Sequence, residues 1–279
     1  MYLPQKFTHS VTRGLLNTSI DGLRRLGLLK EQDPEELSPI FVLSTGRCGT
    51  QTLAALLGAS SDLLAVHEPR PSLYGCSASA YAMGLSAAQP YSALVQETRD
   101  PLLTAAVRLG KRYAETSPQM TFLAPGLQIL YPKARFIHLT RDAEAVICSG
   151  LGRNWYQGAD ADSTRIYPRA GSEAACAWAG WAPETKLAWL WDETNAWIEQ
   201  SLTDCQYRRI KAESIFAGET ELEDLFAWLD VSKPRKNKSA AILARKLNAS
   251  HNTAECSLPQ DAVQLISSRM DAYGYHRST

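Results

Sequence analysis

The stretch from Pro39 to Leu57 (PIFVLSTGRCGTQTLAALL) limits the fold more than any other part of the sequence. The apolar run 40–43 is typical of a buried parallel strand, and the leucines and alanines at the end of the stretch indicate a helix. The loop between them, residues 44–52, is small and polar and contains Gly46 and Gly49. Backbone N–H groups in such a loop, together with a helix N-terminus, attract an anion. The stretch therefore predicts an α/β fold with a phosphate-binding loop.

The side chains of this loop support the prediction but leave alternatives. Arg47 adds a fixed cation, and Thr50 and Thr52 add hydroxyl donors. A strand-to-helix turn can also carry glycine for geometry alone, and nucleotide kinases and ATPases bind phosphate with a similar loop. Those enzymes place a lysine after the second glycine, whereas Thr50 follows Gly49 here. Cys48 is interpreted as a small residue in place of serine, because the local sequence offers no histidine base.

Composition limits the partners and the cellular compartment. The 279 residues are 45% hydrophobic, which is enough to form a sizeable core. The 29 basic and 29 acidic residues balance, so no overall field favours nucleic acid, and any anion site must be local. No stretch resembles a signal peptide or a transmembrane segment. Six scattered cysteines without metal-ligand spacing indicate reduced thiols, no metal site and a cytoplasmic protein.

The order of patterns indicates a single domain over the whole chain, 1–279. Within 72–118 we expect two or three helices, the clearest over 105–113. We divide the domain into a helical lead-in (1–38), a core (39–231) and a C-terminal segment that ends in an amphipathic helix (232–279).

Two polar residues follow the second predicted strand, 63–66. His67 and Glu68 come directly after it and are followed by two prolines that stiffen the exit. Ligands of open α/β sheets bind beyond the carboxyl ends of the strands, so we expect both side chains beside the first loop. The alternative is a solvated glutamate next to a histidine that caps the chain locally.

The stretch 134–150 (ARFIHLTRDAEAVICSG) combines an arginine with a serine after another strand pattern. Ser149 lies eight residues beyond Arg141, about two helical turns further on, and returns to roughly the same face. Such a pair would hold a phosphate through charge-assisted hydrogen bonds. Alternatively, Arg141 pairs with Asp142 or another acid as a structural brace. His138 is interpreted as a buried strand histidine.

Three later stretches leave their roles open. Residues 151–172 are polar and rich in arginine and aromatic residues, which suits either a loop that closes over an anion or a mobile surface loop. The tryptophan-rich stretch 173–202 is predicted to be core rather than a cofactor platform. The basic run 234–246 would either reach a phosphate or form a solvated face.

With both motifs in order, the chain resembles the sulfotransferases that use 3′-phosphoadenosine-5′-phosphosulfate (PAPS). Residues 44–52 are similar to the 5′-phosphosulfate-binding loop of that family. Residues 136–149 are similar to its 3′-phosphate motif, in which an Arg-Asp follows a strand and a serine lies eight positions beyond the arginine. The strand and helix pattern over 207–231 is also similar. The resemblance implies a three-layer, P-loop NTPase-like sulfotransferase fold with a central parallel sheet flanked by helices.

The resemblance also implies a role for each matching residue. Arg47 matches the basic residue that contacts the bridging oxygen and the 5′-phosphate, and Arg141 and Ser149 match the pair that holds the 3′-phosphate. The sequence departs from the common pattern at Ala143, where proline is usual, and at two positions of the loop. The residues that would wrap the 5′-phosphate are Thr45, Gly46, Cys48, Gly49, Thr50, Gln51 and Thr52.

The implied reaction transfers a sulfuryl group from PAPS to a hydroxyl or amine of a small-molecule or carbohydrate acceptor and releases PAP, without a metal. Glu68 is the predicted general base, and His67 is the second candidate. The likeness is to the bacterial and carbohydrate-type branch; no nucleic-acid partner is expected, and a homodimer is left open. Two other classes remain: a P-loop nucleotide kinase that needs ATP and Mg²⁺, and a non-catalytic module that binds PAP without turnover.

Overall fold

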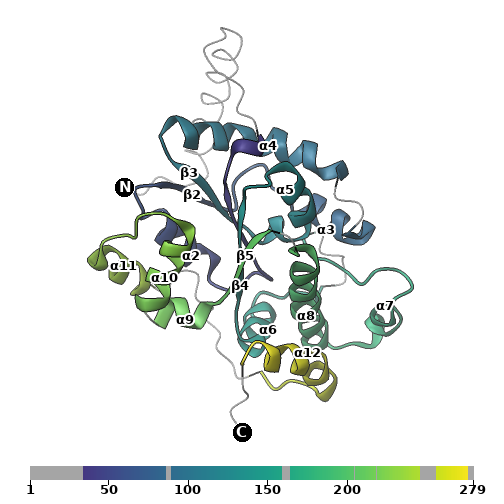
Figure 1. Ribbon diagram of the computed structural model, residues 1–279. Coiled ribbons are helices and arrows are strands. Elements are labelled where there is room, and N and C mark those ends of the chain that lie inside the picture. Colours follow the sequence, from purple (N-terminus) through teal and green to yellow (C-terminus); the bar gives the residue numbers. More distant parts are fainter. Residues whose placement is uncertain are drawn as a thin grey trace, which may run out of the picture.

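A computed structural model describes residues 34–85, 89–158, 164–203, 205–217, 219–245 and 256–275. Five parallel strands form one sheet in the order β2-β3-β1-β4-β5 (Figure 1). Because β1 pairs with β3 on one side and β4 on the other, it is the central strand. The predicted α/β fold with a central parallel sheet is confirmed. The strands are β1 (Ile40–Leu43), β2 (Leu63–His67), β3 (Arg112–Thr116), β4 (Arg135–Thr140) and β5 (Gln206–Lys211).

Helices cover both faces of this sheet. In Figure 1, α2, α10 and α11 lie on one side of the strands, and α3 and α5 lie on the other. The α-helices are α2 (Thr50–Leu57), α3 (Tyr74–Met83), α4 (Gln89–Arg108), α5 (Ala124–Leu130), α6 (Ala143–Leu151), α7 (Glu173–Ala177), α8 (Pro183–Ser201), α9 (Ala212–Ala217), α10 (Glu219–Leu229), α11 (Lys236–Leu243) and α12 (Gln260–Ala272). Three short 3₁₀ segments accompany them: η1 (Pro34–Glu36), η3 (Pro118–Leu123) and η4 (Trp178–Gly180).

The central strand shows why its sequence is a continuous apolar run. Ile40 and Val42 belong to a core shared with α2, α6, α8, α10 and α12. Phe41 and Leu43 point to the opposite face and pack with residues of α3, α4 and α5. All four side chains are fully buried. A strand that is buried on both faces needs apolar residues at every position, and this arrangement gives the predicted three layers.

The prediction of a helix over 105–113 is wrong at its C-terminal end. Helix α4 stops at Arg108, and the chain turns at Gly110, whose φ is +65°. Residues Arg112–Thr116 (RYAET) then form β3, which pairs with both β1 and β2. Because three of its five residues are polar, β3 lacks the apolar run that marks a buried strand in a sequence.

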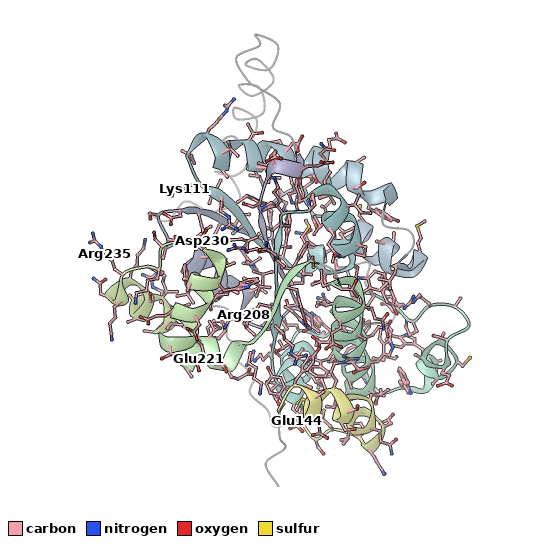
Figure 2. All side chains as sticks on the ribbon, in the orientation of Figure 1. Lys111, Glu144, Arg208, Glu221, Asp230 and Arg235 are labelled. Carbon is pink, nitrogen blue, oxygen red and sulfur yellow. A yellow bond between two sulfur atoms is a disulfide. The ribbon has the colours of Figure 1, made fainter. Side chains whose placement is uncertain are left out.

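Several other expectations can be checked against the described residues. Residues 1–33 of the predicted helical lead-in (1–38) lie outside the described residues. The rest of the lead-in contains η1, at 34–36. The predicted C-terminal amphipathic helix is confirmed as α12. Trp189, Trp191 and Trp197 of α8 are buried in the core, as predicted. Within the basic run, 235–238 is exposed, and Figure 2 shows Arg235 pointing outward near α11, as on a solvated face.

The prediction that all cysteines are reduced is wrong for one pair. Cys148 and Cys256 form a disulfide, with a Cα–Cα distance of 5.7 Å. The two residues lie 108 positions apart, so no local spacing could reveal the pair. The cytoplasmic location, which was inferred from reduced thiols, stays a prediction. None of the described helices has the length and hydropathy that a membrane crossing requires.

Candidate anion-binding site

The loop after β1 is strongly curved because three of its residues adopt left-handed backbone conformations. Gly46 has a φ of +83°, Arg47 of +59° and Gly49 of +82°. A Cβ atom on Gly49 would lie 2.4 Å from Cε2 of Phe216, so only glycine fits this position. Gly49 is also the N-cap of α2, so the curve delivers the chain directly into the helix N-terminus. The predicted strand, loop and helix are therefore all present.

The start of the loop is fastened to the neighbouring segment η3. The Thr121 hydroxyl accepts a hydrogen bond from the Ser44 N–H at 3.1 Å and donates one to the Ser44 carbonyl oxygen at 3.0 Å. The Ser44 hydroxyl in turn accepts from the Gly46 N–H at 3.1 Å. Beyond the curve, the Thr50 side chain is buried, Thr52 is half-buried and Gln51 is exposed in the first turn of α2. The start of the loop is therefore held in place by hydrogen bonds, and its end is partly exposed to solvent.

The two motifs from the sequence meet at this loop. Arg47 Nε donates to Ser149 Oγ at 2.8 Å, and a terminal guanidinium nitrogen of Arg141 donates to the Arg47 carbonyl oxygen at 2.7 Å. The β1–β4 pairing makes this contact possible, because Arg141 directly follows β4 and Ser149 lies in α6. Residues about a hundred positions apart therefore form one hydrogen-bonded cluster, the Arg47–Arg141–Ser149 cluster.

Asp142 does not act as the brace that was considered for Arg141. Its Oδ1 accepts a hydrogen bond from the Ala145 N–H at 2.9 Å and so caps the N-terminus of α6. The Arg141 carbonyl oxygen accepts a hydrogen bond from the indole N–H of Trp191 at 3.0 Å. The backbone at Arg141 is therefore held by the cap on one side and by α8 on the other.

Positive charge is concentrated around this cluster. Burial lowers the pKa of Arg47, and the nearby charges of Arg153, Arg141 and Arg165 lower it further. These four arginines come from the loop, from the end of β4 and from the segments after α6. Since the chain as a whole has no net charge, the field is local, as the composition requires of an anion site.

Cys48 is a buried structural residue in this loop. Its thiol lies 3.3 Å from both Thr45 Oγ1 and the Gly46 carbonyl oxygen. Burial raises the pKa of the Cys48 thiol to about 11, so the group stays protonated at neutral pH. A protonated, inaccessible thiol is a poor nucleophile, which agrees with its interpretation as a small residue in place of serine.

We expected His67 and Glu68 directly beside the loop. They lie at the same edge of the sheet as the loop but further from it. Strand β3 separates β2 from β1, so two strand spacings, about 10 Å, lie between them. His67 Nδ1 lies 2.7 Å from the Thr116 carbonyl oxygen, and its Nε2 lies 3.8 Å from Glu68 Oε1. Glu68 has a φ of +44°, and its Oε1 accepts from the Tyr74 hydroxyl at 3.0 Å. The two residues form a partly exposed pair at the edge.

A buried ion pair that was not predicted from the sequence fixes the chain close to His67 and Glu68. Arg99 of α4 contacts both carboxylate oxygens of Glu115 in β3, at 2.8 and 3.0 Å, and both side chains are fully buried. The Tyr113 hydroxyl also donates to Glu115 at 2.7 Å. Arg99 donates a further bond to the Pro71 carbonyl oxygen at 3.1 Å, which fixes the chain three residues after Glu68. Both residues stand among other polar residues in the sequence, so nothing local signals the pair.

A cleft opens between the loop, η3 and the helices α3 and α8, and we call it the α3–α8 cleft. It is narrow, with a cavity volume of about 30 Å³, and it is partly open to solvent. Residues 164–166 close it on one side, and the Arg165 guanidinium lies 3.5 Å from the centre of a Trp155 ring. Residues 164–166 are therefore packed against the protein, while the role of 151–172 in closing over an anion stays a prediction. The lining residues are Ser44, Thr45, Tyr74, Ser77, Ala78, Pro118, Phe122, Thr164, Arg165, Ile166, Leu190 and Thr194.

Among solved structures, the chain is similar in fold to known sulfotransferases. A sulfotransferase domain from the curacin biosynthetic pathway aligns with 87% of this chain and 99% of its own, at 14% identity and a TM-score of 0.50. The sulfotransferase STF9 from Mycobacterium avium aligns with 94% of this chain and 82% of its own, at 11% identity and a TM-score of 0.51. At such low identity the likeness shows the fold alone, and that fold is the expected P-loop-like sulfotransferase fold.

The sequence comparison identifies the family. A family model described as the sulfotransferase family matches residues 39–232, which is more than half of the chain. The chain therefore belongs to the sulfotransferase family. A search of curated proteins gave no match. In the described ranges, no three His, Cys, Asp or Glu side chains gather in a way that could hold a metal ion.

Proposed function

We propose that this protein transfers a sulfuryl group from PAPS to a hydroxyl or amine of an acceptor and releases PAP. Membership of the sulfotransferase family supports sulfuryl transfer in general. The observation that carries the specific proposal is the Arg47–Arg141–Ser149 cluster, which joins the two motifs that match the 5′ and 3′ ends of the donor. A ligand with phosphate groups at both ends would engage each motif.

The donor would be held by main-chain and side-chain groups of this chain. The curved loop and the N-terminus of α2 supply N–H groups for the 5′-phosphosulfate. Arg141 and Ser149 would hold the 3′-phosphate, and Arg47 would face the bridging oxygen. Ser149 already accepts from Arg47 Nε, so its hydroxyl proton is free to point toward a phosphate oxygen. One serine would thereby couple the two ends of the donor.

The transfer itself needs charge stabilisation and a base. The acceptor oxygen forms a bond to sulfur while the bond from sulfur to the bridging oxygen breaks, and PAP leaves with the negative charge. Arg47 would stabilise that charge, because its surroundings already favour an anion. The acceptor proton would pass to Glu68, whose carboxylate receives a hydrogen bond from Tyr74.

His67 remains the second candidate for the base. The Thr116 carbonyl oxygen can only accept, so Nδ1 of His67 donates to it and Nε2 carries the lone pair. Nε2 lies 3.8 Å from Glu68 Oε1. Both residues therefore stay candidates for the proton acceptor, and a substitution must distinguish them.

The first experiment measures PAP binding and transfer together. We expect PAP to raise the melting temperature and labelled PAPS to pass its ³⁵S to an acceptor without added Mg²⁺. PAP binding without transfer to any of a broad acceptor panel would favour the non-catalytic module. Transfer of phosphate from ATP that requires Mg²⁺ would favour the kinase. No thermal shift at saturating PAP would refute donor binding.

The second experiment tests the base. Glu68→Gln keeps the shape and the Tyr74 contact but cannot accept the proton, so turnover should fall by about 10²- to 10⁴-fold while PAP affinity is retained. His67→Asn is the matched control on the neighbouring residue. If Glu68→Gln turns over normally and His67→Asn does not, the role passes to His67.

A further inference from the structure

The side chain of Trp155 packs directly against the phosphate loop. A Cβ atom on Gly46 would lie 3.5 Å from Cη2 of Trp155, and a Cβ atom on Gly150 would lie 3.1 Å from its Cε3. The residue is only 9% exposed. The indole ring is therefore wedged between the loop and helix α6, and it touches a glycine of each.

The backbone on both sides of Trp155 is left-handed. Asn154 and Tyr156 each have a φ of +57°. Asparagine tolerates this conformation, whereas it is unusual for a residue as bulky as tyrosine. Strained residues persist where the surrounding structure holds them, and they gather at binding and active sites. The strained turn 154–156 lies at the border of the proposed donor site, where it fixes the Trp155 ring.

The Trp155 ring supports the guanidinium group of Arg165 on its face. Cζ of Arg165 lies 3.5 Å from the ring centre, which is within the range of a cation–π contact. The backbone next to Arg165 is fixed as well, because the Ile166 carbonyl oxygen accepts a hydrogen bond from the Tyr156 hydroxyl at 2.6 Å. The turn 154–156 thus holds both the side chain of Arg165 and the chain beside it.

Arg165 lies on the side of the loop that faces the proposed base. It lines the α3–α8 cleft together with Ser44 and Thr45 of the loop. Tyr74 lines the cleft as well, and its hydroxyl donates to Glu68. A cavity volume of about 30 Å³ has room for about two or three water-sized groups. This is too little for a whole acceptor molecule, but it suits the oxygens of one sulfuryl group.

The charge of Arg165 acts on the same anion site as the Arg47–Arg141–Ser149 cluster. After burial, the charges of Arg153, Arg141 and Arg165 all lower the pKa of Arg47. Among the described residues, Arg165 is the one of these arginines that lines the cleft. The proposed roles of Arg141 at the 3′-phosphate and of Arg47 at the bridging oxygen leave the sulfuryl group itself for Arg165.

We propose that Arg165, held on the Trp155 ring, donates hydrogen bonds to the non-bridging oxygens of the sulfuryl group of PAPS. Stacking uses the face of a guanidinium group, so its N–H groups can still donate in the plane. This inference rests on the proposed sulfuryl transfer and adds a residue to it.

In the transfer, Arg165 would orient the reacting group. The three non-bridging oxygens stay on sulfur while the bond from sulfur to the bridging oxygen breaks and the bond to the acceptor oxygen forms. The acceptor proton passes to the base, and Arg165 keeps its own protons. Arg165 would hold the sulfur in line between the bridging oxygen and the acceptor oxygen.

Calorimetric titration with PAPS and with PAP, which differ in the sulfuryl group, tests this role. Arg165→Met should weaken PAPS binding by about 10-fold or more, the loss of a charge-assisted hydrogen bond, and should change PAP binding by less than about 3-fold. Arg165→Lys keeps the charge but not the planar guanidinium, so it should recover part of the affinity for PAPS.

Arg169 provides the matched control in the same segment. Its guanidinium group pairs with Glu193 at 3.1 Å and lies 4.8 Å from the centre of the Tyr81 ring. Arg169→Met should therefore lower the melting temperature more than Arg165→Met does, and it should leave the ratio of the PAPS and PAP dissociation constants unchanged. Equal effects of the two variants on this ratio would mean that Arg165 only holds the segment in place, which overturns the inference.

The same titrations distinguish the failure of this inference from the failure of the proposed function. If wild-type protein binds PAP and Arg165→Met weakens PAP and PAPS equally, or weakens neither, the contact with the sulfuryl group is refuted and the donor assignment stands. If wild-type protein binds neither PAP nor PAPS, the proposed function fails and this inference fails with it.

Discussion

Two arginines near the carboxyl edge of the sheet have opposite electrostatic surroundings. Arg99 is fully buried and contacts both oxygens of Glu115, so its charge is matched inside the protein. Arg47 is only partly buried; this burial lowers its pKa most, and the neighbouring charges of Arg153, Arg141 and Arg165 lower it further. The Arg99–Glu115 site is complete without a ligand, whereas several arginines lie together around Arg47.

From this difference we predict that Arg99 serves stability and that the arginines around Arg47 serve anion binding. Like charges that are held together oppose folding, so a cluster of this kind is expected where an anion joins it. A matched buried pair instead fixes the backbone around it, here at Pro71. Removing one partner should therefore affect unfolding at Arg99 and ligand binding at Arg141.

The largest expected effect is on stability, at Arg99. Arg99→Met leaves the Glu115 carboxyl group buried without its cation, which should lower the free energy of unfolding by about 3–5 kcal/mol in urea titrations. Arg99→Met/Glu115→Leu removes both charges and should recover most of that loss. If the single variant is as stable as wild type, Arg99 and Glu115 do not form the complete site described above.

An intermediate effect is expected on binding, at Arg141. Arg141→Ala should weaken PAP binding by about 10- to 150-fold, the loss of a charge-assisted hydrogen bond of about 1.5–3 kcal/mol, as measured by titration calorimetry. Its unfolding should change by less than Arg99→Met does. Arg235→Ala, at the exposed residue that precedes α11, is the control and should bind PAP normally. Tight PAP binding by Arg141→Ala would remove the 3′-phosphate role.

The smallest effect is expected on the pH dependence of stability, at His138. This buried side chain stays uncharged instead of pairing with an acid. Its Nε2 lies 2.6 Å from Asn195 Oδ1 and its Nδ1 lies 2.9 Å from the Tyr207 hydroxyl, and burial lowers the pKa of His138 to about 3. Between pH 6.5 and 3 the unfolded chain binds the proton and the folded chain does not. Stability should therefore fall by about 1.4 kcal/mol per pH unit below 6.5 from this residue alone.

Urea unfolding at pH 7.0 and 5.5 measures this dependence. His138→Gln removes the titrating group, so its stability should change less between the two pH values than that of wild type. An equal change in both proteins would mean that other groups carry the acid sensitivity.

The parts of the fold with a strong local signal could be predicted from the sequence. The run Ile40–Leu43, the glycines after it and the Arg141–Ser149 spacing all depend on neighbouring residues, and the structure contains each of them. The missed features depend on contacts between distant segments. Strand β3 carries a buried Glu115 because this side chain pairs with Arg99, and the Cys148–Cys256 bond joins residues that no spacing rule relates.

The strand order also bears on how the protein is made. The central strand β1 pairs with β3 and β4 but not with β2, the strand that is synthesised next. At about 5–20 residues per second, β1 waits roughly 4–14 s on the ribosome for its first neighbour. The loop that follows it cannot meet Arg141 and Ser149 until β4 and α6 have emerged as well. A nascent chain therefore acquires its anion site only after more than half of the polypeptide has been translated.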